Sequence, residues 1–216
     1  WAFRVWAPHA ASAALAVRRA GPGGAGGEEA IPLERDGDHW RASGLDLGHG
    51  DAYRVELQTP DGPLVRRDPY ARWVEPEPSK WCLVDNAAAF QWQSSEWAPR
   101  PYDELVVYEM HVGSFTPEGT LEAATAKLQH VADLGFTAVQ VMPLAEFSRA
   151  FSSWGYNPKQ LLALEPALGA PEDLRRFVDA AHGLGLGVIV DIVLHHGSPA
   201  GNELWDYDGW EEAANG

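Results

Sequence analysis

The chain has 216 residues, of which 45% are hydrophobic and 11% aromatic, so it can bury a core and is not expected to be disordered. Its formal net charge is -15, from 31 acidic and 16 basic residues, which disfavours binding to the phosphate backbone of nucleic acids. The single cysteine, Cys82, excludes an internal disulfide and any metal site built from cysteines. No apolar run approaches the roughly 20 residues of a membrane span.

Residues 1 to about 97 contain short alternating stretches of polar and apolar residues, separated by turn residues. Such stretches occupy residues 3–8, 14–17 and 53–57, and Asp61-Gly62 is typical of a hairpin turn. This pattern predicts a small β-sandwich of the immunoglobulin-like type, with Trp6 and Trp40 in its core. Residues 21–27 form a glycine-rich loop, and prolines from residue 69 onward mark an irregular connector that begins at about residue 68.

From Glu104 the pattern changes to alternating strands and helices. Strands are expected at residues 105–110, 138–142 and 188–194. One helix is expected at residues 121–132, capped by Thr120 and ended by Gly135, and another from Pro171. This order implies a parallel sheet with right-handed crossovers.

Both an open doubly wound sheet and a (β/α)8 barrel begin this way. No phosphate-binding glycine loop follows the first strand, which weakens the dinucleotide-binding alternative. The long loop from Pro143 to about Leu168 suits a barrel. A complete barrel needs roughly 250 residues, so residues 104–216 are expected to hold a partial barrel that ends after its third strand. Such a partial sheet would expose an apolar face and an unpaired edge.

The run from Val188 to His196 is the most informative stretch. It reads as a strand buried on both faces, yet it contains Asp191, and burying an unpaired carboxylate costs several kcal/mol. A carboxylate followed by His195 and His196 at the exit of a parallel strand lies where barrel enzymes place their active sites.

Several motifs together resemble the α-amylase superfamily, glycoside hydrolase family 13. Residues 107–115 (Val-Tyr-Glu-Met-His-Val-Gly-Ser-Phe) resemble its first barrel strand. Residues 141–144 followed by Ser-Trp-Gly-Tyr-Asn-Pro at 153–158 resemble its second strand and loop, and residues 191–196 resemble its first signature region. Residues 3–8, 50–53 and 68–71 resemble carbohydrate-binding module family 48.

The resemblance implies roles in substrate binding. Tyr156, next to Trp154, would stack on the sugar at the cleavage subsite. Asp191 would hold an arginine beside the nucleophile, and His196 would form a hydrogen bond with a sugar hydroxyl and polarise it in the transition state. His195 departs from the asparagine that hydrolytic amylases carry and associate with calcium. Because imidazole is a poor calcium ligand, no metal is expected, and branching-type members are favoured.

The implied reaction is a retaining double displacement on α-1,4-glucan. In this family both catalytic carboxylates follow later strands, so no catalytic residue is expected in residues 1–216, and the fragment alone is expected to be inactive. The resemblance is nearest to a 1,4-α-glucan branching enzyme. A maltooligosyltrehalose trehalohydrolase and a non-catalytic glucan-binding protein remain alternatives.

Glycogen, starch or maltooligosaccharides are the expected partners, with no nucleic acid, no membrane and no cofactor. A cytoplasmic or plastid location is expected, although no targeting segment indicates the compartment.

Overall fold

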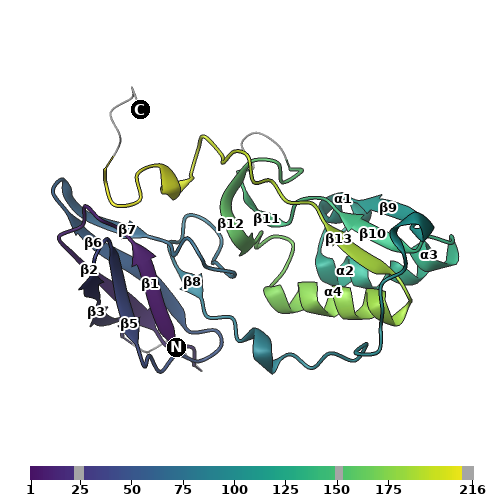
Figure 1. Ribbon diagram of the computed structural model, residues 1–216, viewed down its shortest axis with the longest axis horizontal. Coiled ribbons are helices and arrows are strands. Elements are labelled where there is room, and N and C mark those ends of the chain that lie inside the picture. The colour runs from purple at the N-terminus through teal and green to yellow at the C-terminus, as the bar shows by residue number, and fades with distance from the viewer. Residues whose placement is uncertain (22–26, 149–152, 211–216) are drawn as a thin grey trace. The chain divides into compact units, whose positions relative to one another are not determined.

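The computed structural model describes residues 1–21, 27–148 and 153–210 (Figure 1). These residues form two compact units: the first comprises residues 1–86 and 202–210, and the second comprises residues 87–201. The sequence-based boundary lay near residues 97–104 and assigned residues 202–210 to the second domain, whereas in the structure they belong to the first unit. Most of the expected glycine-rich loop at residues 21–27 lies outside the described residues.

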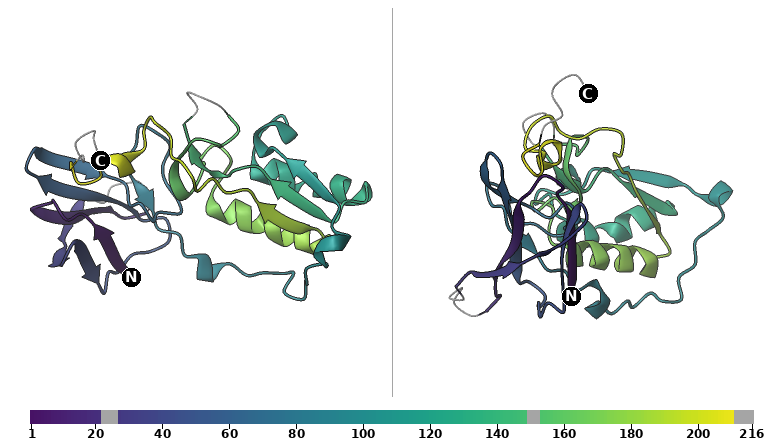
Figure 2. Two further views of the ribbon diagram at one scale, coloured as in Figure 1. Left: turned by 45° about the horizontal axis from the view of Figure 1, so that its top comes forward. Right: turned by 60° about the vertical axis from the view of Figure 1, so that its left-hand side comes forward.

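The first unit consists of two antiparallel sheets. One sheet has the order β1 (Ala2–Trp6), β5 (His39–Ser43), β4 (Glu34–Asp36). The other has the order β3 (Glu29–Pro32), β2 (Ser12–Arg18), β6 (Ala52–Thr59), β7 (Gly62–Arg66), with β8 (Cys82–Leu83) paired to β6. Both sheets contribute to one apolar core, which includes Val5, Leu15 and Val55. The sheets therefore pack face to face, as the two layers of strands in Figure 2 show.

The two tryptophans expected in this core lie on opposite faces of their sheet. Val5 pairs with Trp40, and Trp6 pairs with His39. Residues directly opposite each other on neighbouring strands share a face, and successive residues alternate faces. Trp40 is therefore buried with Val5, whereas Trp6 is 52% exposed. The prediction for Trp40 is confirmed, and the prediction for Trp6 is wrong.

Residues 202–210 complete the first unit. The Tyr207 ring joins the sandwich core, and its hydroxyl donates a hydrogen bond to the Arg67 carbonyl at 2.9 Å. The backbone N–H of His9 donates to Asp208 Oδ2 at 2.7 Å, and the His9 ring stacks on Trp210 with centroids 4.7 Å apart. The short 3-10 helix η3 (Glu203–Trp205) is held as well, because Glu203 Oε2 accepts a hydrogen bond from the Arg67 N–H at 2.9 Å.

The second unit is built on a parallel sheet, as predicted. Its order is β13 (Gly187–Val190), β10 (Ala138–Val141), β9 (Val107–Met110). In register, Val139 lies opposite both Tyr108 and Val188. The sequence-based strands overran the hydrogen-bonded ones, most of all at the third, which ends at Val190 and leaves Asp191 outside.

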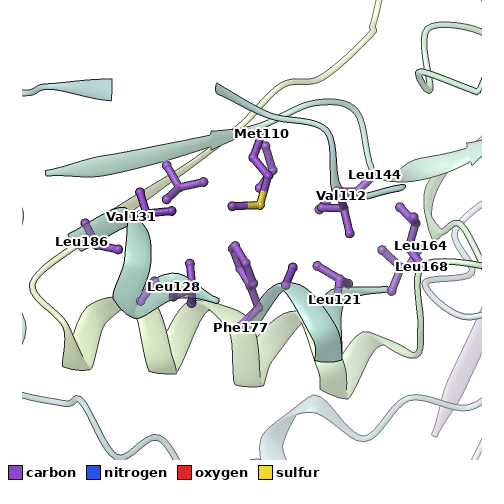
Figure 3. Close-up of a cluster of buried hydrophobic side chains, with 14 residues drawn as sticks. Met110, Val112, Leu121, Leu128, Val131, Leu144, Leu164, Leu168, Phe177 and Leu186 are labelled. Carbon is purple, nitrogen blue, oxygen red and sulfur yellow. The ribbon is translucent and has the colours of Figure 1, made fainter. Parts of the chain in front are cut away.

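Helices cover one face of this sheet (Figures 1 and 2). After α1 (Val112–Phe115) come α2 (Leu121–Thr125) and α3 (Leu128–Asp133), which replace the single helix expected at residues 121–132. The Thr120 side chain accepts a hydrogen bond from the Ala123 N–H at 3.3 Å, so the predicted cap is confirmed. The long helix α4 (Pro171–Gly183) presents Phe177 to a core that contains Met110 and Leu128 (Figure 3).

The loop between β10 and α4 contains an antiparallel hairpin that was not predicted. It pairs β11 (Ala145–Phe147) with β12 (Pro158–Leu164). β11 has only three residues, and β12 places the polar pair Lys159-Gln160 in buried positions. A short strand and buried polar residues both hide the usual alternation of a strand.

The connector runs through two 3-10 turns, η1 (Ala87–Ala89) and η2 (Tyr102–Glu104). Asp179 on α4 holds it by accepting hydrogen bonds from the backbone N–H groups of Gln93 and Ser94, the latter at 2.9 Å. The Trp97 ring stacks on His182 with centroids 3.8 Å apart. Among the described residues, no helix has the length and apolar character needed to cross a membrane.

Candidate active site

The candidate site lies at the carboxyl ends of the parallel strands. Met110, Val141 and Val190 end the three strands and lie in register across the sheet. The Asp191 N–H donates to the Val141 carbonyl at 3.0 Å, which extends the pairing by one residue. Asp191 therefore emerges at the edge of the sheet where barrel enzymes carry their chemistry.

Tyr156 and Asp191, two residues selected from the sequence, are in direct contact. The Tyr156 hydroxyl donates a hydrogen bond to Asp191 Oδ2 at 2.7 Å. This hydrogen bond, together with burial and the negative charge of Asp191, raises the pKa of Tyr156 to about 12. The phenol therefore stays protonated at neutral pH. Its hydroxyl is the hydrogen-bond partner that offsets the free-energy cost of burying part of the Asp191 carboxylate.

His196, the third selected residue, is held by both ring nitrogens. Nε2 lies 2.7 Å from the backbone carbonyl oxygen of Tyr156, and Nδ1 lies 2.6 Å from Nδ1 of His195. Both imidazoles are exposed. The loop after β13 is thereby tied twice to Tyr156, once through Asp191 and once through His196.

Gly155 shapes the loop that carries Tyr156. Its φ of +89° lies in the left-handed region, which side chains with a Cβ rarely adopt. A Cβ at this position would lie 2.4 Å from the carbonyl oxygen of Pro143. Trp154, the fourth selected residue, is 59% exposed beside it. No role was assigned to Gly155 from the sequence, although a glycine between two aromatic residues in a loop was the available signal.

His111 also contributes to this loop; the sequence left it open between a structural and a functional role. Its Nδ1 lies 2.8 Å from Ser114 Oγ, and its Nε2 lies 3.0 Å from the Ser153 carbonyl oxygen. His111 follows β9 directly, so it links the end of the first strand to the residue before Trp154. Neither Ser114 nor Ser153 was identified from the sequence.

The loop beyond His196 is anchored in turn. Ser198 is fully buried, and its N–H donates to the Pro158 carbonyl at 2.7 Å. Pro158 begins β12, the strand that also carries the buried Lys159, whose Nζ lies 3.8 Å from Glu146 Oε1. The hairpin that the sequence did not predict is thus a support for the loop that holds both histidines.

The arrangement offers the Asp191 carboxylate, a phenol, imidazoles and an exposed indole at one sheet edge. Polar groups that donate and accept hydrogen bonds, next to flat aromatic faces, suit a hydroxylated ligand with an apolar side. Within residues 1–21, 27–148 and 153–210, no cluster of three or more His, Cys, Asp or Glu side chains is arranged to hold a metal ion.

Two known families match the two parts of the sequence. The family described as "Alpha amylase, catalytic domain" matches residues 71–206. The chain belongs to the alpha-amylase family. Carbohydrate-binding module 48, described as the isoamylase N-terminal domain, matches residues 1–71. All four residues selected for substrate binding lie in the alpha-amylase match.

Relatives of this alpha-amylase family chain have different activities. It is 38% identical over 205 residues to the malto-oligosyltrehalose trehalohydrolase of Deinococcus radiodurans, covering 95% of this chain and 32% of the relative. It is 34% identical over 221 residues to a 1,4-alpha-glucan branching enzyme of Burkholderia thailandensis, covering 96% and 26%. A crystal structure described as a putative alpha amylase from Salmonella typhimurium superposes with a TM-score of 0.82 at 36% identity, covering 94% and 33%. The chain therefore spans about a third or less of the length of these relatives.

Proposed function

We propose that this chain forms the substrate-positioning side of an α-glucan active site in a longer enzyme of the alpha-amylase family. The observation that carries the proposal is the hydrogen bond between Tyr156 and Asp191 at the strand ends. It fixes an aromatic ring beside a carboxylate at the edge of the sheet where barrel enzymes bind their substrates. Tyr156 would stack on a glucose ring, Trp154 would flank it, and His196 would donate to a hydroxyl.

In this proposal the chain holds the sugar and residues beyond Gly216 break the bond. A retaining mechanism needs a carboxylate nucleophile and a carboxylic acid on either side of the glycosidic bond. The Asp191 carboxylate, which accepts the Tyr156 hydroxyl, takes neither of these roles in this proposal. Its proposed role is to hold an arginine side chain beside the nucleophile. That arginine would in turn orient the reacting carboxylate.

The first candidate for the whole enzyme is a 1,4-α-glucan branching transferase. The acceptor would be the 6-hydroxyl of a second glucan. His195 in place of the asparagine of hydrolytic amylases supports this choice, and so does the similarity to the Burkholderia thailandensis branching enzyme.

The second candidate is a trehalose-releasing hydrolase. It is favoured by the 38% identity to the Deinococcus radiodurans trehalohydrolase. The two candidates share the retaining chemistry and differ in the acceptor, a sugar hydroxyl in one case and water in the other.

Assays of the longest polypeptide that contains this chain distinguish the two candidate activities. A branching transferase lowers the iodine absorbance of amylose with little gain in reducing ends, whereas the hydrolase releases trehalose from maltooligosyl trehalose. Residues 1–216 alone should do neither. Glucan binding without turnover, seen by affinity electrophoresis in glycogen, would contradict both enzyme candidates if the longest polypeptide behaved in the same way.

A pair of substitutions tests the positioning role. Tyr156→Ala removes the ring and should lower kcat/KM by about a hundredfold or more, because a misplaced sugar loses the alignment that catalysis needs. Tyr156→Phe keeps the ring and loses only the hydrogen bond to Asp191, so its loss should be about tenfold. Tyr102→Ala, at a tyrosine that is 89% exposed, is the matched control. Equal activity of Tyr156→Ala and Tyr102→Ala would rule out the positioning role.

A further inference from the structure

We propose that His195 is a positioning residue that, together with the Tyr156 carbonyl, holds the His196 ring with its hydrogen on Nε2, the atom proposed to donate to a sugar hydroxyl. The inference rests on the proposed function and adds a role for the residue at which this chain departs from the amylase motif. Four described groups carry it: the two imidazoles, the Tyr156 carbonyl and the Tyr156 hydroxyl.

The first step concerns His196 Nε2. It lies 2.7 Å from the backbone carbonyl oxygen of Tyr156. A carbonyl oxygen can only accept a hydrogen bond, so Nε2 must be the donor and carry the hydrogen. A neutral imidazole has one N–H, so Nδ1 of His196 has a free lone pair and is an acceptor.

The second step concerns the contact between the two rings. Nδ1 of His195 lies 2.6 Å from Nδ1 of His196, and two ring nitrogens at this separation need a hydrogen between them. Since His196 Nδ1 is the acceptor, His195 Nδ1 is the donor. His195 is therefore the Nδ1–H tautomer, and its Nε2 carries no hydrogen.

The result is a directed chain of hydrogen bonds. His195 donates to His196, His196 donates to the Tyr156 carbonyl, and the Tyr156 hydroxyl donates to Asp191. Through Tyr156, these bonds connect Asp191 at the start of the loop after β13 with His196 further along the same loop. They hold the His196 ring in one orientation with a donor at Nε2, and both rings are exposed, so a sugar oxygen can replace the Tyr156 carbonyl without a change of tautomer.

Nuclear magnetic resonance tests the tautomers directly, without any activity assay. The longest polypeptide that contains this chain is labelled at histidine with a heavy nitrogen isotope and observed well above the usual histidine pKa of about 6.5. We expect His195 as the Nδ1–H form and His196 as the Nε2–H form. An Nε2–H form of His195 would overturn the proposal.

Variants then separate the hydrogen bond from the shape of the ring. His195→Phe keeps a ring but has no donor, so only the Tyr156 carbonyl would still favour the Nε2–H form of His196. The Nδ1–H form of His196 should therefore be populated more than in the unchanged protein, and kcat/KM should fall about three- to tenfold. His195→Asn restores an amide N–H donor and should return both the tautomer signal and the activity. His130→Phe, at an exposed histidine of α3, is the control and should change neither.

These outcomes distinguish the two proposals. Equal losses in His195→Phe and His195→Asn, or no loss in either, would refute the role of His195 in an enzyme that is otherwise active. Absence of all glucan activity would refute the proposed function, while the resonance experiment would still decide the tautomers.

Discussion

Gly155 sets the direction of the residues that are proposed to meet the ligand. The left-handed φ of +89° and the contact with Pro143 both require a residue without a Cβ. Gly185 provides a comparison, because its φ of +75° is also left-handed but open space surrounds it. The first glycine is therefore constrained by both its conformation and its neighbours, and the second by its conformation alone.

Alanine substitutions measure these two constraints. Gly185→Ala should lower the free energy of unfolding by about 1–2 kcal/mol, the cost of the left-handed conformation. Gly155→Ala should lower it by at least about 1 kcal/mol more, because the backbone must move away from the new methyl group. Urea unfolding of both variants gives the difference, and equal values would mean that the Pro143 contact imposes no constraint.

The hydrogen bond that Tyr156 donates to Asp191 predicts that the Tyr156 hydroxyl loses its proton at a higher pH than an ordinary tyrosine. With Asp191 ionised, the pKa of Tyr156 is raised to about 12. Asp191→Asn removes the charge and weakens the hydrogen bond, so this pKa should fall toward the usual value of about 10. The ultraviolet absorbance of tyrosinate against pH reports the shift as the difference between the two proteins. Superimposable titration curves would contradict the contact.

The sequence pointed to the residues that are proposed to face the ligand better than to the residues that support them. Tyr156, Asp191 and His196 were selected because aromatic, carboxylate and imidazole side chains at a strand end suggest chemistry. Ser153 and Ser198 act through backbone groups, and backbone contacts leave no trace in the residue type. The contact between His195 and His196 was equally hidden, because adjacent residues in an extended segment usually face apart.

At the scale of elements, α4 is a support for the connector as well as for the sheet. Although burial opposes it, hydrogen bonds from Gln93 and Ser94 lower the pKa of Asp179. Burial lowers the pKa of His182, whose ring stacks on Trp97. The negative charge of Asp179 offsets only part of this shift. Both groups thus hold fewer protons in the folded chain than in the unfolded one.

These shifts predict a loss of stability in acid. The contribution of Asp179 is present above its unfolded pKa of about 3.9 and is lost as pH falls through its lower folded pKa. The contribution of His182 is present above about 6.5 and is lost as pH falls below that value. Asp179→Asn should flatten the acidic part of the unfolding free energy against pH, and, because it removes the charge that raises the pKa of His182, it should steepen the part nearer neutrality. His182→Phe should flatten the part nearer neutrality. The reverse assignment in urea titrations at several pH values would refute this explanation.

The elements themselves were predictable where one periodicity continued for long enough. The helix from Pro171 and the three parallel strands followed from apolar spacing and from the glycines and proline beside them. The hairpin of β11 and β12 did not, because buried Lys159 and Glu146 pair with each other and imitate a polar loop in sequence. The break between α2 and α3 at Ala126 and Lys127 carried neither glycine nor proline.

At the scale of the whole molecule, the alternation of a β-rich part and a βα part was evident from the sequence. The return of residues 202–210 to the first unit was not, because contacts distant in sequence have no local signal. The expected exposed apolar surface of a partial sheet is present: Val107 and Val190 on the two edge strands are 40% and 43% exposed.

A substitution of Tyr207 would show how much residues 202–210 contribute to the stability of the first unit. Tyr207 is 6% exposed and joins the sandwich core. Tyr207→Ala should lower the free energy of unfolding of this unit by roughly 3–5 kcal/mol, as for other large aromatic side chains removed from a core. Trp205→Ala, at a side chain that is 67% exposed, should have a far smaller effect. Thermal unfolding followed by tryptophan fluorescence would compare them, and equal effects would place Tyr207 outside the core.

The position of Tyr207 has a consequence for how the protein is made. A ribosome releases the chain from its N-terminus, and domains commonly fold as they emerge. Here the sandwich core gains the Tyr207 side chain only after β9, β10 and β13 have been synthesised. Until then β7 and the Arg67 carbonyl lack the partners that Tyr207 and its neighbours later supply. Folding during synthesis is therefore expected to follow the order of contacts rather than the order of the sequence, because the first unit gains the Tyr207 contacts only after β9, β10 and β13 have been synthesised.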